Sequence, residues 1–76
     1  MENLEQKVTI HDDYITLGQL LKEVGLISTG GQAKWFLQDT LVVVNEENEN
    51  RRGKKLYAGD VIVIDDFGSI LIEKES

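Results

Sequence analysis

The 76-residue chain has no cysteine, so neither a disulfide nor a thiolate metal site can hold it together. A chain of this length buries only about 60% of the surface that it exposes when unfolded, which leaves it a thin core. Hydrophobic residues make up 41% of the sequence, as in ordinary globular domains. We therefore expect a single small domain over residues 1–76, stabilised by packing of Leu, Ile, Val and a few aromatic side chains.

The sequence also lacks long apolar segments. No run approaches the roughly 20 apolar residues that a membrane-spanning helix needs. The first five residues, Met-Glu-Asn-Leu-Glu, are polar and acidic, unlike a signal peptide. We expect a cytoplasmic protein with no membrane partner.

Side chains suited to catalysis are scarce. The single histidine, His11, stands beside Asp12 and Asp13 in a polar segment, where a histidine is usually just solvated. Gly30 and Gly31 are not followed by the Lys-Ser/Thr of a phosphate-binding P-loop. We expect no enzyme activity, no catalytic residue, no metal site and no cofactor.

The formal net charge is −6, which taken alone opposes binding to nucleic acid. The distribution of the charge matters more than its sum. Half of the eight basic residues lie in one short stretch without any acid, namely Arg51, Arg52, Lys54 and Lys55. An arginine can hold a phosphate with two hydrogen bonds, and a lysine adds a point charge. We predict a phosphate-binding basic patch here, although the same loop could simply be solvated.

The first part of the chain predicts a strand and then a helix. Residues 6–10 alternate apolar and polar side chains, which is typical of a half-buried strand. A helical stripe follows, formed by Leu17, Leu20, Leu21 and Val24. Thr16 and Gln19 have the spacing of a capping box, and Gly25 is well placed to end the helix.

A second helix is predicted after Thr29, which could cap it, with Gly30 and Gly31 in its first turn. Glycine inside a helix costs about 1 kcal/mol relative to alanine, so two in succession need a reason. Either the two helices pack closely there, or a phosphate approaches the bare backbone at the helix start. The sequence favours neither reason.

The helical wheel of this second segment has two sides. Ala33, Phe36 and Leu37 form its inward face, whereas Lys34, Trp35 and Gln38 project away from that face. A tryptophan off the apolar face could stack on an unpaired base, with Lys34 reaching the backbone of the nucleic acid. It could also cover another part of the fold, and we expect packing rather than stacking.

The remaining segments predict strands at 41–44, 56–57, 61–64 and 70–72, separated by turns at 45–50 and 65–69. Together with the first strand, they predict an α+β domain. Two short helices would pack on one face of a small, twisted, mainly antiparallel sheet of four to five strands.

Three motifs resemble a known family. They are Ser-Thr-Gly-Gly-Gln-Ala-Lys at 28–34, Val-Val-Val-Asn at 42–45 and Gly-Asp-Val-Ile-Val at 59–63. In this order after a helix they resemble the S4 RNA-binding domain, named for ribosomal small-subunit protein four. The resemblance covers residues 15–64, and the short chain is most similar to the stand-alone YaaA-type S4 proteins of bacteria.

The resemblance implies binding of structured RNA, with ribosomal RNA as the expected class, by the second helix and adjoining loops. It places contacts at Gly30, Gly31, Gln32 and Lys34, to which we add Trp35 and the basic cluster. The chain departs from the family where it has Gly30 and Gly31 in place of a basic residue. Single-stranded DNA stays open as the ligand.

A second function class stays open beside RNA binding. The acidic composition and an outward Trp35 would also suit a protein-interaction adaptor on a ribosomal or nucleic-acid-processing complex, because tryptophan is enriched at binding hot spots. We expect the chain to be a monomer in either case.

Overall fold

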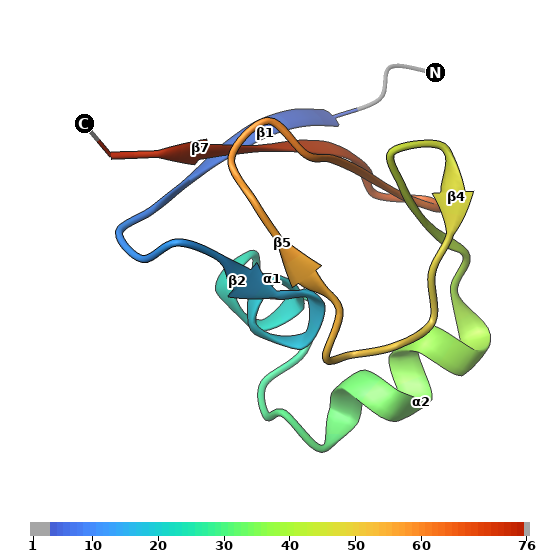
Figure 1. The fold of residues 1–76 in the computed structure, drawn as a ribbon. Coiled ribbons are helices and arrows are strands. Elements are labelled where there is room, and N and C mark those ends of the chain that lie inside the picture. Colours follow the sequence, from blue (N-terminus) through green and yellow to red (C-terminus); the bar gives the residue numbers. More distant parts are fainter. Residues whose placement is uncertain (1–3, 76) are drawn as a thin grey trace.

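The computed structural model of the protein describes residues 4–75 and shows two helices on a β-sheet (Figure 1). Residues 1–3, which belong to the polar start used above to argue against a signal peptide, lie outside this range. The elements in chain order are β1 (Leu4–Ile10), β2 (Ile15–Thr16), α1 (Leu17–Glu23), α2 (Gln32–Asp39), β3 (Val42–Val44), β4 (Glu47–Asn48), β5 (Lys55–Leu56), β6 (Val61–Ile64) and β7 (Gly68–Lys74). Within residues 4–75, no helix has both the length and the apolar character that crossing a membrane requires.

The predicted α+β class is confirmed, with a five-stranded sheet in the order β1-β7-β6-β3-β4. Its pairs are antiparallel except for β1 with β7, which run parallel, so the sheet is mixed. Strands β2 and β5 form a separate two-stranded ladder.

Two details of the predicted strands need correction. The segment 45–50, expected to be only a turn, contains the short strand β4. The last strand was expected to close the sheet, but β7 lies inside it, because the N-terminal strand β1 adds along its outer side. That pairing joins the two ends of the chain and cannot be read from local periodicity.

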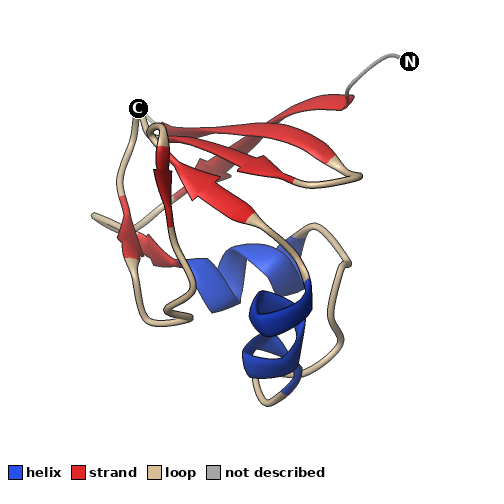
Figure 2. Cartoon of the chain, turned by 90° about the vertical axis from the view of Figure 1, so that its right-hand side faces the viewer, coloured by secondary structure: helices blue, strands red, loops and turns tan. Residues whose placement is uncertain are grey.

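Both helices cover the same face of the sheet, as predicted (Figure 2). The core lies between the helices and the sheet. It consists of side chains that alternate inward along the strands, together with the apolar stripes of the helices. Its buried members are Ile10, Leu17, Leu20, Leu21, Ile27, Ala33, Leu37, Val42, Val44, Leu56, Ile62, Ile64, Ile70 and Ile72. Burial of these aliphatic groups is the main source of stability in a chain without disulfides.

Helix α1 begins and ends as the sequence predicts. The Thr16 hydroxyl accepts a hydrogen bond from the Gln19 backbone N–H at 3.2 Å, and the Gln19 side chain accepts one from the Thr16 N–H at 3.0 Å. This is the predicted capping box. The helix ends at Glu23, and Gly25 follows with a φ of +82°, a left-handed conformation that favours glycine.

Helix α2 begins later than predicted. Its first residue is Gln32, so Gly30 and Gly31 form the turn that leads into it rather than its first turn. Thr29 does not cap the helix with its side chain. Instead the Gln32 side-chain oxygen accepts hydrogen bonds from the backbone N–H groups of Ser28 and Thr29, at 2.5 and 3.1 Å.

Two of the family motifs are joined by hydrogen bonds. Asn45 and Glu46 both have positive φ, as a tight two-residue hairpin requires, and they connect β3 with β4. The Asn45 side-chain amide donates to the Asp60 carboxylate at 3.0 Å and accepts from the Val61 N–H at 2.9 Å. Asp60 also accepts from the Tyr57 N–H at 2.8 Å. The Val-Asn and Gly-Asp motifs therefore fix a junction of the fold.

Replacing Asp60 with alanine should lower the free energy of unfolding by about 1–2 kcal/mol, because it removes both hydrogen bonds of its carboxylate. Urea unfolding followed by circular dichroism measures the change. Asp65→Ala is the matched control, since Asp65 is exposed in the next turn, and it should change the free energy by less than about 0.5 kcal/mol. Equal losses of unfolding free energy in the two variants would show that the hydrogen bonds of Asp60 do not stabilise the fold.

Candidate functional site

The basic loop, residues 51–55, is attached to the start of α1 by backbone hydrogen bonds. The carbonyl groups of Arg52 and Lys54 accept from the N–H groups of Gly18 and Leu17, each at 2.8 Å. A side chain at Gly18 would crowd this contact, because a Cβ atom there would lie 3.3 Å from the Arg52 carbonyl oxygen. The first N–H groups of a helix have no partner within it, so the loop satisfies them and is held in place.

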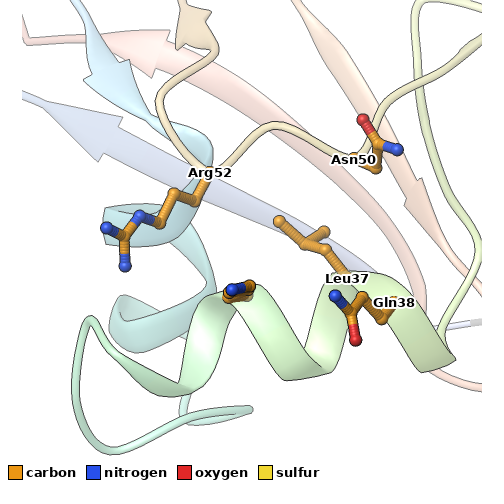
Figure 3. Close-up of a pocket in the computed structure, with 5 residues that line it drawn as sticks. Leu37, Gln38, Asn50 and Arg52 are labelled. Atoms are coloured by element: carbon orange, nitrogen blue, oxygen red, sulfur yellow. The ribbon is translucent and has the colours of Figure 1, made fainter.

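Arg52 also reaches the turn that leads into α2. Its Nη1 donates a hydrogen bond to the Gly30 carbonyl oxygen at 3.3 Å. A groove of about 520 Å³ opens between the loop and α2, lined by Lys34, Leu37, Gln38, Asn50 and Arg52. Figure 3 shows Leu37 extending from the helix towards the chain segment that carries Asn50 and Arg52, with Gln38 beside it on the helix. The structure thus brings three of the predicted positions together: Gly30, Lys34 and Arg52.

The two glycines before α2 are not needed for packing. A Cβ atom at Gly30 would have no neighbour within 4 Å, and one at Gly31 would meet only the Thr29 hydroxyl at 4.0 Å. Gly31 has a φ of −66°, which any residue adopts easily. Close packing of the helices, one of the two reasons considered above, is therefore excluded. Approach of a ligand to the bare backbone, the other of the two reasons, stays a prediction.

Trp35 lies on the surface, so the prediction that it packs within the fold is wrong. Its exposed fraction is 64%, whereas its neighbour Phe36 is partly buried against the core. Only Ala33 and Leu37 of α2 are fully buried, so the helix presents a narrow stripe to the sheet and the indole falls outside it. The Lys34 ammonium lies 5.7 Å from the centre of the indole ring, within cation–π range.

Arg51 is already paired. Its side chain donates two hydrogen bonds to the Glu49 carboxylate, at 2.9 and 3.1 Å, and its backbone N–H donates a third at 3.0 Å. The hydrogen bond from the Arg51 guanidinium lowers the pKa of Glu49 to about 2, while the same contact raises the pKa of Arg51. The charge of Arg51 is therefore largely compensated at short range.

The two lysines of the basic loop lie outside the groove. Lys55 lies in β5, and its ammonium is 4.9 Å from the centre of the Tyr14 ring, which itself contacts Tyr57. Lys54 is partly buried and lines a second hollow near the β3–β4 hairpin. Of the four clustered cations, Arg52 is the one that shares the groove with Lys34. The positions of these side chains depend on the loop path, which the sequence does not reveal.

Some groove residues carried no signal that sequence reasoning used. Gln38 was assigned to the outward face of its helix but given no role, and Asn50 was seen only as part of a polar turn. Gln32 is exposed at the start of α2, and its side-chain oxygen holds the preceding turn. His11 pairs with Glu75 at the far end of β1. Within residues 4–75 no three histidine or acidic side chains gather closely enough to hold a metal ion.

Comparison with known proteins shows which family the chain resembles. The S4 domain family matches residues 8–73, which is most of the chain. A curated relative from Bacillus subtilis (strain 168), the probable ribosome maturation protein RlbA, is 52% identical over 65 residues. The aligned part covers 86% of this chain and 92% of that relative.

The Glu49–Arg51 pair predicts a pH effect on stability. Because the pKa of Glu49 is depressed in the folded state, the pair stabilises the fold above pH about 4.5, and this contribution is lost as the pH falls towards 2. Glu49→Gln should lower the free energy of unfolding by about 1 kcal/mol at pH 7. The effect is no larger because the Arg51 side chain is 71% exposed, and water weakens an exposed ion pair.

The measurement is urea unfolding of both proteins at pH 7 and pH 2.5, and the difference between them should shrink at the lower pH. Glu46→Gln, in the neighbouring turn, controls for the loss of one negative charge. A difference that stays constant from pH 7 to 2.5 would contradict the assigned ion pair.

Proposed function

The chain belongs to the S4 domain family, and from this premise we propose that it is a non-catalytic RNA-binding module acting on structured RNA. Ribosomal RNA is the expected class, because the 52% identical relative is named as a probable ribosome maturation protein. Such a role would place the protein in the cytoplasm. The observation that carries the proposal is the groove lined by Lys34 and Arg52, together with the hydrogen bond from Arg52 to Gly30 in the turn before α2.

A phosphate group fits this turn for two physical reasons. Backbone N–H groups and the positive end of a helix favour an anion at its start, and glycine lets the anion come close. The Arg52 guanidinium carries five N–H donors, and its one bond to the Gly30 carbonyl leaves donors for a phosphate. We propose contacts at Gly30, Gly31, Gln32, Lys34 and Arg52.

Trp35 would add a contact of a different kind. An exposed indole offers a flat surface on which an unpaired base can stack, and such stacking is worth about 1–3 kcal/mol per base. Lys34 lies beside the ring and would neutralise the adjoining phosphate. The preferred RNA would then have an unpaired nucleotide next to a helix, as in a loop or bulge.

The other loop cations would act at longer range. Lys54 and Lys55 add positive potential around the groove without lining it. Arg51 contributes less, because Glu49 compensates its charge. We therefore rank Arg52 and Lys34 above Arg51, Lys54 and Lys55 as binding residues.

The exposed Trp35 also favours the alternative, a protein-interaction adaptor on a ribosomal or nucleic-acid-processing complex. The two functions differ in their dependence on RNA. An adaptor that used this face would keep its partners after nuclease treatment, whereas an RNA-binding module would lose them.

Charge reversal at the groove should weaken RNA binding. Trp35 is the single tryptophan of the chain, so its fluorescence reports on the site directly when a ribosomal RNA fragment is added. Lys34→Glu combined with Arg52→Glu should lower affinity by at least roughly tenfold. It should also make the slope of log affinity against log salt shallower by about 1.5, the value for two lost phosphate contacts.

Lys22→Glu is the control for this measurement, since Lys22 is exposed at the end of α1 and outside the groove. Single substitutions at Lys34 and Arg52 should each give part of the effect. If Lys22→Glu weakens binding as much as the groove variants do, the attraction is unspecific and the proposed site is wrong.

The glycine turn allows a test that separates stability from binding. Gly31→Ala should raise the free energy of unfolding by about 0.4–1 kcal/mol, because φ is −66° and the new methyl group meets no close neighbour. RNA affinity should nevertheless fall, since that methyl group blocks close approach of a phosphate. Gly53→Ala, on the basic loop and also without neighbours within 4 Å, is the control. A more stable Gly31→Ala variant with full RNA affinity would remove the glycine turn from the site.

A further inference from the structure

The face of the sheet turned away from the helices carries a group of aliphatic side chains. Side chains alternate between the two faces of a strand, and those that alternate outward on β3, β6 and β7 are mostly Val and Leu. We call this group the outer-face patch, consisting of Val43, Val61, Val63 and Leu71, with Leu41 directly before β3. Leu41, Val61 and Val63 have exposed fractions of 55%, 40% and 44%.

The strand register makes the patch continuous. Val43 lies directly opposite Val63, and Val61 lies directly opposite Leu71, on adjacent strands. Such cross-strand neighbours have Cβ atoms about 5 Å apart, so their side chains touch. No helix covers this face in Figure 2, where both helices lie on the other side of the sheet. An antiparallel sheet with one face in water usually alternates to polar residues there, so this patch departs from the ordinary pattern.

Charged residues around the patch are mostly acidic. Glu5 and Glu73 alternate outward on β1 and β7, and Asp65 and Asp66 lie in the turn after β6. Among the outward residues of the five strands in the part of the chain described, Lys7 is the one base. It lies directly opposite Leu71, and the acids Glu5 and Glu73 outnumber it. Two copies of the chain placed face to face would set acid against acid. A partner with basic residues around an apolar centre would match both features.

We propose that the outer-face patch docks a basic protein, which presents aliphatic side chains bordered by Lys and Arg. The patch and the RNA groove lie on opposite sides of the sheet, because the groove is formed by α2 and the basic loop on the helical side. The protein would then hold RNA on one face and a basic protein on the other. This inference does not depend on the RNA site, and each can fail alone.

In-cell crosslinking tests the proposal. A photo-crosslinking residue replaces Ser69, which lies directly opposite Val63 on the outer face and leaves the patch intact. We expect one discrete protein adduct in which the crosslinked segment carries net positive charge and aliphatic side chains. The adduct should persist after nuclease treatment and in the Arg52→Glu variant, which weakens only the RNA groove.

Two sets of variants check that the patch is responsible. Val61→Thr with Val63→Thr keeps the β-branched shape but removes apolar surface, and it should lower the adduct yield at least threefold while RNA binding is unchanged. Glu5→Lys with Glu73→Lys should have a similar effect by reversing the rim charge. Asp12→Lys with Glu23→Lys, outside the patch, is the matched control and should leave the yield as it was.

Urea unfolding of each variant confirms that the chain stays folded before yields are compared. The proposal is overturned if no protein adduct forms or if the adduct joins two copies of this chain. It is also overturned if the captured segment is acidic, or if the adduct disappears with nuclease treatment.

Discussion

The attachment of the basic loop to the start of α1 is the interaction on which the candidate binding surface depends. A helix start presents N–H groups that have no partner in the helix, and here the carbonyl groups of Arg52 and Lys54 accept from two of them. Gly18 favours the contact, because a Cβ atom there would crowd the Arg52 carbonyl group. The loop is thereby fixed against the helices, and Arg52 reaches the turn before α2.

An acidic protein that binds RNA needs its charges separated in space. The chain has 14 acidic and eight basic residues, so its total charge repels phosphate at long range. The fold gathers Lys34 and Arg52 at one groove and holds one nearby acid, Glu49, in a pair with Arg51. Many of the remaining acids lie at turns and on the outer face of the sheet. The local potential at the groove can thus be positive although the whole molecule is negative.

Much of the fold was predictable because its signals are local. The stripe of α1, its capping box and the glycine that ends it involve residues within a few positions of each other. The inward face of α2 and the strands β1, β3, β6 and β7 followed from periodicity in the same way. The start of α2 was misplaced by two residues, because Thr29 was taken as its cap, whereas in the structure the Gln32 side chain holds the backbone of the preceding turn. The position of β7 inside the sheet was missed, because its parallel partner β1 comes from the other end of the chain.

The sequence by itself determined the α+β class, the two helices, the family motifs and the residue types available for binding a phosphate. Tertiary structure alone decided which of them meet. Arg52 joins Lys34 while Arg51 turns to Glu49, and Trp35 stays on the surface although Phe36 next to it is partly buried. These outcomes depend on the path of a loop and on the pairing of strands distant in sequence. Periodicity describes only one helix or strand at a time, so it cannot specify contacts between them.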